Sequence, residues 1–463
     1  MPREESRVLL VVCLGTFFHM QSVGSIGVSL SAIQKEFDAT LAAVQWIGLM
    51  GSIMLSSLSL GFGRAGDLIG RRTIFKTGLT LYTAGAGLAA FSGTFAQLLA
   101  SRCVMALGLA MAAPMAAAII ASVHGHDHRG RALGLLAASI ALGRTTGPTI
   151  GGAILQLWGW RAVFLANCIF GVATCVTMFL IFKGKEERRK VSVDYLGVLS
   201  LVVGFPSFLI ALTAGTRLGW DASDIVLWLA LAATGIVSFV WRELHAEAPL
   251  MNLRYFRSIP FVRSMLSLVL ATLAFYPVAI FGPIYLLNVI GTAPLAAGLA
   301  MATLPLCTTL LSPLSGRLAD RFNPRWVAVL GLCIILLGVF FYARLGQDST
   351  LIWIVFVLSI LGAGIGLFVP ANDKAAFSTV PSRDYGMLAA MLTTFGTGSG
   401  ALGTTVAVAL AEIAKRSRIS GDAAGFAYDQ QFAFWTLLPL AALAVLVSLL
   451  GKRERVRRSG YAP

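Results

Sequence analysis

Three ionisable side chains in this sequence stand inside long apolar runs, where a charge is costly: His19, Arg102 and Arg144. Such a side chain within a bilayer usually faces a cavity or a partner group. Arginine can hold a carboxylate or phosphate through two parallel hydrogen bonds, and histidine exchanges a proton near pH 6.5. We therefore expect the two arginines to make a central cavity electropositive, favouring anionic or zwitterionic ligands, and His19 to be a candidate proton carrier.

Both inferences have plainer alternatives. Arg144 could extend along the helix toward water or pair with an acid from another helix. His19 could be an ordinary hydrogen-bonded histidine. The sequence leaves these alternatives open.

A second pattern is a charged, glycine-containing segment that occurs twice, as GRAGDLIGRR at 63–72 and GRLADRFNPR at 316–325. A loop that only orients the chain by positive charge would explain the arginines, but not an acid at the same place in both copies. A carboxylate at such a turn can accept hydrogen bonds from helix N-terminal amides and pair with nearby arginines. We predict a gating motif, with Asp67 as a conformational latch. Its residues are Gly63, Asp67, Gly70, Arg71, Arg72, Asp320, Arg321 and Arg325.

Glycines at four-residue spacing mark the segment GRTTGPTIGG. Its residues of interest are Gly143, Gly147, Pro148, Gly151 and Gly152. At this spacing Gly143, Gly147 and Gly151 form one bare helix face that lets a neighbouring backbone approach closely, and Pro148 bends the helix. Plain helix packing is the alternative, but the Gly-Pro and Gly-Gly pairs favour a hinge or seal between two halves of the molecule.

The elements that carry these residues are expected to span a membrane. Apolar residues make up 57% of the 463 residues and charged residues 12%, against roughly 45–50% and about 25% in soluble proteins. A spanning helix needs about 20 mainly apolar residues. Fourteen runs of this kind predict an all-α integral membrane protein. They lie near 8–32, 41–62, 74–94, 97–121, 132–157, 162–182, 195–213, 224–241, 262–288, 295–315, 326–344, 351–371, 386–411 and 431–450.

The basic residues predict the orientation. Assigning alternate connections to the side of the N-terminus collects there about 27 of the 36 Lys and Arg residues, which is typical of the cytoplasmic side. We expect both termini in the cytoplasm and the chain in the plasma (cell inner) membrane. The net charge of +15 is thereby explained without a nucleic-acid partner.

An internal repeat divides the spans into two halves. Matching residues recur at offsets of about 253 to 256, and two extra spans lie between the copies. The matches pair Gly63, Asp67, Arg72, Gly108, Pro114, Gly130 and Gly147 with Gly316, Asp320, Arg325, Gly364, Pro370, Gly386 and Gly403. We predict a six-helix half at 1–190, a two-helix linker at 191–250 and a second six-helix half at 251–463.

With these motifs the sequence resembles the major facilitator superfamily, whose signature in the first loop is G-x-x-x-D-x-x-G-R-[RK]. The number of spans and the segment GRTTGPTIGG are similar to the fourteen-helix drug:proton antiporter branch. So are Trp158-Gly159-Trp160-Arg161 just after that segment, Asp194-Tyr195-Leu196-Gly197 and Pro294-Leu295-Ala296-Ala297-Gly298. The resemblance implies a major facilitator bundle that exports small amphiphilic molecules by alternating access, coupled to protons, with the substrate near the bilayer midplane.

The chain departs from this family in two places. Arg102 resembles the buried arginine of the family's fourth span, but Met105-Ala106 follows it where relatives usually have Gln-Gly. Relatives of this branch commonly carry a coupling Asp in the first span, at the position of Ser22. No acid lies between Arg7 and Lys35, so we expect His19, one turn from Ser22, to replace it if protons drive transport.

Other signals are weaker. The GxGxxG run at 398–403 lies in an apolar span with no preceding strand, and His124-Gly125-His126-Asp127-His128 is expected to be a solvated loop rather than a metal site. Asp373 and Lys374 are expected to form a helix-end ion pair. Six scattered cysteines are expected to be free thiols. We expect no cofactor, no metal and a monomer.

The function that these patterns favour is transport, and no enzymatic motif accompanies them. The expected activity is proton-coupled antiport of a small molecule, drug-like and anionic or zwitterionic. A proton-independent facilitator or exchanger is the closest alternative, because the first span lacks an acid. A non-transporting membrane sensor is the alternative from another class.

Overall fold

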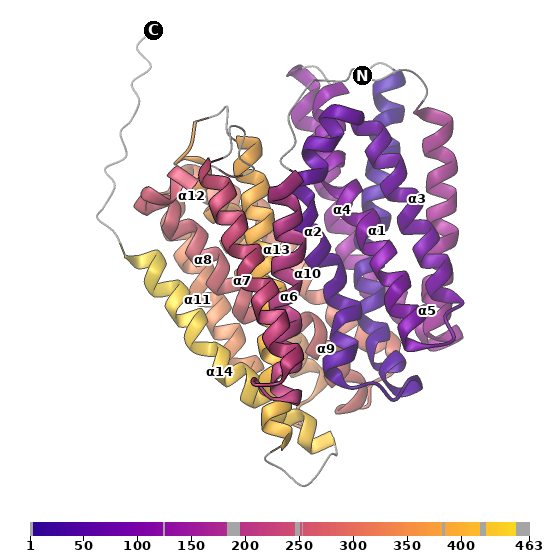
Figure 1. The fold of residues 1–463 in the computed structure, drawn as a ribbon, viewed down its shortest axis with the longest axis vertical. Helices are drawn as coiled ribbons and strands as arrows, with labels where there is room; N and C mark the ends of the chain where they lie inside the picture. Colours follow the sequence, from indigo (N-terminus) through magenta and orange to yellow (C-terminus); the bar gives the residue numbers. More distant parts are fainter. Residues whose placement is uncertain are drawn as a thin grey trace.

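The computed structural model describes residues 3–123, 126–182, 195–245, 251, 253–381, 385–416 and 423–450. Within these ranges the chain forms fourteen α-helices and one short 3-10 helix, and no strand (Figure 1). The all-α fold predicted from the sequence is confirmed. Most of the predicted loop between the first half and the linker lies outside the described residues.

The helices have the following bounds. They are α1 (Arg3–Glu36), α2 (Leu41–Ile69), α3 (Arg71–Ala90), α4 (Phe95–Val123), α5 (His126–Ile181), α6 (Tyr195–Leu218), α7 (Ser223–His245), η1 (Leu253–Arg257), α8 (Ile259–Phe275), α9 (Val278–Asn288), α10 (Pro294–Arg321), α11 (Pro324–Tyr342), α12 (Leu351–Phe377), α13 (Tyr385–Arg416) and α14 (Ala423–Leu449).

One predicted boundary lies inside a single helix range, and one predicted span is divided into two helices. The 56-residue α5 contains Gly159 with a φ of 80°, a conformation that favours glycine, and the chain reverses there. It therefore holds the predicted spans 132–157 and 162–182. Conversely, α8 and α9 are separated at Tyr276 and Pro277, and together they form the predicted span 262–288.

The count of membrane crossings follows from these boundaries. Twelve described segments are long and apolar enough to cross a membrane, with Gly134–Ile181 taken as one segment. Dividing that segment at Gly159 adds a crossing, and the 20-residue α3, which lies antiparallel to α4, adds another. Fourteen crossings result, as predicted from the sequence.

Glycines set the same close helix contact in each half. In the first half α3 meets α4 where Gly78 faces Gly108, and a Cβ on either glycine would collide with the other's main chain. In the second half α11 meets α12 where Gly331 faces Gly364 in the same way. Small residues let helix backbones approach closely enough for dispersion contacts in a membrane. The predicted repeat positions Gly108 and Gly364 thus have equivalent packing.

The described apolar core falls mainly into two clusters. One draws its buried residues from α1 to α5 together with Ile280 and Ile284 of the α8–α9 span, and the other draws chiefly from α8 to α14. Between them, α6 and α7 pack on each other where Gly204 meets Gly235 (Figure 1). Leu209 of α6 joins residues of α2 and α13 in a third, small cluster.

The helices run between two ends of the bundle (Figure 1). The end where α1 begins is called the termini end, because α14 finishes there too: the Leu450 carbonyl accepts from Arg263, near the start of α8. The opposite end, where α1 finishes and α10 begins, is called the far end. In Figure 1 the termini end is uppermost.

Candidate functional site

His19 of α1 lies in a buried polar cluster with Tyr82 of α3. His19 is 2% exposed, and its ring meets the Tyr82 ring edge-on, with 4.2 Å between the ring centroids. The Tyr82 hydroxyl donates to Ser22 Oγ at 2.5 Å. His19 Nε2 has no hydrogen-bond partner among the described residues. The imidazole is thus enclosed, with one ring nitrogen unsatisfied.

Arg102 of α4 lies in the same cluster and is held against α2. Its Nε and Nη2 donate to the Ile47 carbonyl oxygen at 3.0 and 2.9 Å, and its Nη1 donates to Met105 Sδ at 3.4 Å. The side chain is 5% exposed and interacts electrostatically with the Tyr82 hydroxyl. All of these groups are formally neutral, so dipoles compensate the buried charge. One of these dipoles belongs to the thioether of Met105, which stands where relatives usually have Gln.

Tyr82 is the residue that sequence reasoning missed. The sequence singled out His19 and Arg102 separately, and the structure brings both against this tyrosine. A signal for it was present, because a tyrosine inside an apolar span needs a partner for its hydroxyl. The spacing of the residues does not reveal which partner that is.

The glycine face of α5 packs on α1, within the same half. A Cβ on Gly143, Gly147 or Gly151 would collide with α1, at Phe17, Gln21 and Ser25 respectively. Ser25 also donates to the Gly147 carbonyl at 2.9 Å. These three glycines therefore permit a close contact between α1 and α5, rather than lying directly between the halves.

The neighbouring face of α5 does meet the second half. The Pro148 carbonyl lies where a Cβ on Gly298 of α10 would be, and a Cβ on Gly152 would collide with the Pro294 carbonyl. Substituting either glycine would force the two helices apart. The segment predicted as a hinge or seal is thus placed between α1 on one side and α10 on the other.

Polar contacts tie the same region together at the far end. Ser31 donates to Asn288 Oδ1 at 2.6 Å, and the Leu295 amide donates to Gln156 Oε1 at 3.2 Å, both between the halves. Within the first half, Glu36 accepts hydrogen bonds from Trp160 and Arg161 of the WGWR segment, each at 2.6 Å. The two halves are therefore joined at the far end.

Arg144 lies one helical turn from Pro148, toward the termini end, and its side chain is exposed. Ala137, seven residues earlier on this face, is also exposed, whereas Pro148 and Leu155 are buried. The face is therefore covered near the far end and uncovered toward the termini end. Arg144 stands at the edge of the contact between halves, and no described residue forms an ion pair with it.

The first copy of the predicted gating motif forms the turn from α2 to α3. Gly70 has a φ of 119°, which favours glycine, and it ends one helix and begins the next. Arg71 Nη1 donates to the Ala118 carbonyl of α4 at 3.2 Å, and the Arg72 guanidinium lies 5.5 Å from the centre of the Phe182 ring. The backbone of Asp67 is in α2, but its side chain lies outside the described residues.

Gly63 of the same copy and its repeat Gly316 have open space where a Cβ would be. Both lie near the termini end, in the last two turns of α2 and α10. Neither glycine is therefore required by close packing in this conformation.

The second copy links α10, α11 and α12. Asp320 pairs with Lys374, which also donates to the Ala319 carbonyl at 2.8 Å. The expected pair between Asp373 and Lys374 is thus wrong: a lysine points more readily toward the carboxylate of a facing helix than toward its own neighbour in sequence. Arg321 lies in the exposed last turn of α10.

Arg325 binds the last helix of the chain. Its guanidinium donates to the main-chain carbonyls of Ser448, at 2.9 Å, and of Leu449. This arginine therefore caps the C-terminal end of α14, where a helix presents unpaired carbonyls and partial negative charge.

The remaining sequence motifs, where they fall within the described residues, have a structural role or none that binds a ligand. The GxGxxG run lies inside α13, where Gly400 packs on Tyr276 and Gly403 on Leu273. All six cysteines are free thiols, as predicted. No cluster of His, Cys, Asp or Glu in the described residues could hold a metal ion. The side chains of 124–128 lie outside the described residues.

Comparison with known families decides where the chain belongs. The model of the Major Facilitator Superfamily matches it twice, over residues 12–279 and 264–462. The chain belongs to the major facilitator superfamily. Together the two matches cover nearly the whole chain, including α5, α10 and both copies of the gating motif.

Several relatives in this superfamily are named as drug-resistance proteins or transporters. The multidrug resistance protein Stp of Mycobacterium tuberculosis is 26% identical over 412 residues, 89% of this chain and 76% of Stp. The lincomycin resistance protein LmrB of Listeria monocytogenes is 26% identical over 95% of each chain. The riboflavin transporter RibZ of Clostridioides difficile is 25% identical over 86% of each chain. This chain is a multi-pass membrane transporter.

A solved structure has the same fold. A bacterial homologue of the human lysosomal transporter Spinster, in an inward-facing and unoccupied conformation, matches 97% of each chain with a TM-score of 0.72 at 15% identity. At this identity the match concerns the arrangement of the helices. It agrees with the major facilitator bundle expected from the sequence.

Proposed function

We propose that this major facilitator transporter exports small amphiphilic molecules, anionic or zwitterionic, by proton-coupled antiport. The observation that carries the charge preference is Arg144, an exposed cation at the edge of the contact between the halves that forms no ion pair with a described residue. The names of Stp and LmrB support efflux of drug-like molecules.

The substrate would bind between the halves near mid-depth, where major facilitator transporters place it. One polar contact already bridges the halves there, between the Ser52 and Tyr276 hydroxyls at 3.4 Å. Arg144 lies on the termini side of the α5–α10 contact. A ligand with a carboxylate or phosphate could therefore reach its guanidinium without separating the helices.

We further propose that the termini end faces the cytoplasm and that this conformation is open to it. The joined far end and the exposed face of α5 around Arg144 support this assignment. So does the excess of basic residues in connections at the termini end. Alternating access would then open the α5–α10 contact, where Gly152 meets Pro294 and Gly298 meets Pro148, and close the two gating motifs.

Proton coupling is proposed to run through His19, with Tyr82 and Arg102 beside it. The α1 helix has no acid between Arg7 and Lys35, and His19 Nε2 is unsatisfied in the described structure. A second positive charge beside Arg102 would be costly without a counter-charge. A proton on His19 and a bound substrate anion would therefore stabilise each other if both were present at the same step. Antiport then requires that the substrate leave as the proton arrives.

The division into 1–190, 191–250 and 251–463 remains part of this proposal. The two main core clusters support two halves, and the contacts of α6 with α2 and α13 support a linker pair that lies against both. We propose that the linker does not bind substrate and that a monomer is sufficient for transport.

A proton-independent facilitator or exchanger is the second candidate. The observation that favours it is the missing acid in α1, together with the neutral surroundings of His19 and Arg102. Such a protein would carry substrate down its own gradient and ignore a pH gradient.

The test is transport by the purified protein in proteoliposomes, with anionic, zwitterionic and cationic amphiphiles of similar size. The proposal expects flux of anionic or zwitterionic compounds that responds to an imposed pH gradient. Flux restricted to cations would remove the proposed substrate class, and flux indifferent to the gradient would favour the facilitator.

A further inference from the structure

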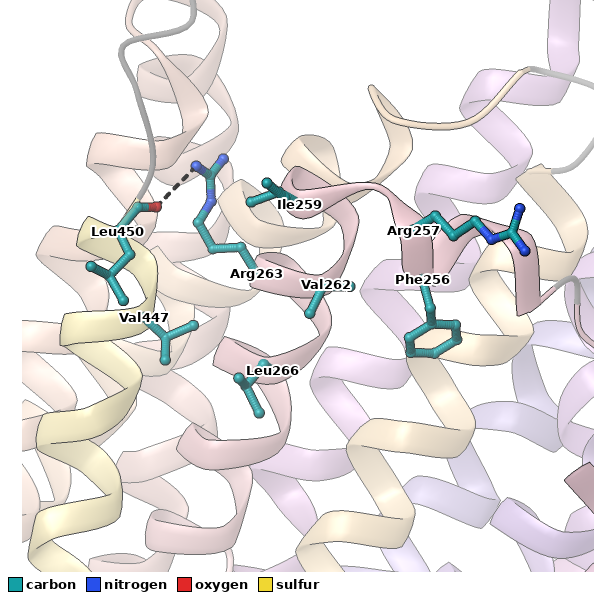
Figure 2. A pocket seen from close by; sticks show the side chains of 8 residues that line it. All are labelled: Phe256, Arg257, Ile259, Val262, Arg263, Leu266, Val447 and Leu450. Carbon is teal, nitrogen blue, oxygen red and sulfur yellow. Dashed lines mark hydrogen bonds between the residues drawn. The ribbon is translucent and has the colours of Figure 1, made fainter. Parts of the chain in front are cut away.

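A groove opens on the outer surface of the bundle at the termini end, between α8 and α14. Its volume is about 290 Å³, and Figure 2 shows its lining. Six of the lining residues are apolar: Phe256, Ile259, Val262, Leu266, Val447 and Leu450. Four of them are at least one-third exposed, with Ile259 at 73% and Leu450 at 68%. In a membrane protein, such apolar exposure at helix ends faces lipid chains.

Two arginines complete the lining, and none of the lining residues is acidic. Arg263 lies on α8 beside the groove and donates to the Leu450 carbonyl, while Arg257 precedes α8 and is exposed (Figure 2). The polar edge of the apolar groove thus carries two positive charges.

The start of α8 adds to this charge. Its N-cap residue, Ser258, makes no side-chain hydrogen bond to the helix. The first amide N–H groups of the helix therefore lack a capping side chain, and they carry the positive end of the helix dipole. They lie beside Ile259, at the rim of the groove.

Arg263 also lines a small polar space. It is lined by Arg263, Arg325, Asn372 and Ser267, among others, and has room for about one water, at about 10 Å³. Asn372 is 3% exposed and Ser267 is 1% exposed. Neither Asn372 Nδ2 nor Ser267 Oγ has a hydrogen-bond partner among the described residues. Two buried donors therefore face a space that holds an oxygen-sized group, as the polar end of an anion site requires.

We propose that this groove binds one anionic phospholipid. Its acyl chain lies along Val262, Leu266 and Val447, and its phosphate lies at Arg263, drawn also by Arg257 and the start of α8. A lipid is favoured over a soluble anion because the apolar part of the groove is continuous with the lipid-facing surface of α8 and α14. Basic pockets at the cytoplasmic ends of membrane helices favour such headgroups.

The site would act on the second half of the transporter from outside the substrate path. Arg263 touches the end of α14 through Leu450, and Arg325 of the second gating motif caps the same helix through Ser448. A bound lipid would therefore hold the starts of α8 and α11 and the end of α14 together. This role is independent of the substrate proposed above.

The test uses the full-length protein in detergent with equal amounts of phosphatidylglycerol and phosphatidylcholine that carry the same acyl chains. Native mass spectrometry counts the lipids retained. We expect one phosphatidylglycerol per chain to be retained in preference. Arg263→Gln should weaken its binding about tenfold, the effect of losing one charge-assisted hydrogen bond, and Arg257→Gln should weaken it less.

A matched control and a steric variant sharpen the result. Arg344→Gln removes the same charge from an exposed arginine over Phe340 at the far end, and it should leave lipid retention unchanged. Val262→Trp should fill the groove and abolish retention while both arginines remain. Glycerol phosphate should not displace the lipid.

Four outcomes would overturn the proposal. They are equal retention of both lipids, equal effects of Arg263→Gln and Arg344→Gln, full retention in Val262→Trp, and displacement by glycerol phosphate. The last would assign the arginines to a soluble anion. Arg263 also contacts Leu450, so Arg263→Gln could fail to fold. In that case Arg257→Gln and Val262→Trp decide the test.

Discussion

Arg144 is the side chain whose removal should change which substrates are carried. It is exposed beside the contact of Pro148 with Gly298, and no described residue neutralises it. A hydrogen bond to a charged group contributes about 1.5–3 kcal/mol. Arg144→Ala should therefore weaken anionic ligands by more than about tenfold and leave neutral ligands nearly unchanged, as measured by ligand binding to the purified protein.

The control is Arg344→Gln, which removes an arginine from the far end and should affect neither class of ligand. An equal loss of anionic and neutral ligands in Arg144→Ala would mean that this arginine has a structural role.

His19 should decide how the pH gradient is used. His19 is a buried titratable side chain of α1, which we propose replaces the acid that α1 lacks, and it contacts Tyr82 directly. His19→Gln keeps a polar group but cannot carry a proton near neutral pH, so gradient-driven flux should fall to the level seen without a gradient. His19→Asp should restore or enhance the response. A Gln variant with the wild-type gradient dependence would remove His19 from the coupling.

These residues show what spacing alone can reveal. His19 and Arg102 were recognisable because a charge inside an apolar run is costly. Tyr82 was not, since its role depends on which helix α1 meets and at what height. The partner of Lys374 was mistaken for the same reason: its nearest acid in sequence is Asp373, but its nearest acid in space is Asp320 on another helix.

At the scale of elements, α5 should be intolerant of added bulk on one face. A Cβ on Gly147 would collide with the main chain of Gln21, whereas one on Gly134 of the same helix meets open space. Overpacking costs about 1–3 kcal/mol. Gly147→Ala should therefore lower the unfolding midpoint in detergent by several degrees, and Gly134→Ala should not. Equal midpoints for the two variants would contradict the close α1–α5 contact.

The turn between α2 and α3 should act as a latch. If Asp67 favours one closed arrangement by about 1–2 kcal/mol, Asp67→Asn should slow turnover about 5- to 30-fold with substrate affinity unchanged. Asp320→Asn is the comparison, because its pair with Lys374 is exposed and such pairs contribute about 0–1 kcal/mol. The measurement is transport rate beside equilibrium binding. Lost binding with a normal rate of interconversion would make Asp67 a ligand residue instead.

Most elements could be predicted from hydropathy because a spanning helix is long and continuous. The reversal at Gly159 falls between the predicted spans 132–157 and 162–182, so hydropathy found this break. Hydropathy missed the division of α8 from α9, which depends on the local backbone at Tyr276 and Pro277. Likewise, the glycine spacing of α5 predicted a close contact but not its partner, which is α1 for one face and α10 for the next.

For the whole molecule, the internal repeat was the most informative feature of the sequence, because it predicted two similar halves. Matching glycines at Gly108 and Gly364 predicted two similar halves, and the α3–α4 and α11–α12 contacts are alike. The conformation was not predictable in the same way. Open and closed arrangements of one sequence differ by a few kcal/mol, so local patterns do not say which is populated.

The most direct test of proton-coupled export follows protons rather than substrate. Proteoliposomes containing the full chain and a trapped pH indicator are loaded with an anionic or zwitterionic substrate and diluted at equal internal and external pH, with the membrane potential clamped. The account predicts that substrate leaving down its gradient drives protons inward, so that the interior acidifies, and that His19→Gln abolishes this signal while substrate efflux continues. Efflux by the wild-type protein with no change in internal pH would contradict the account and identify a facilitator.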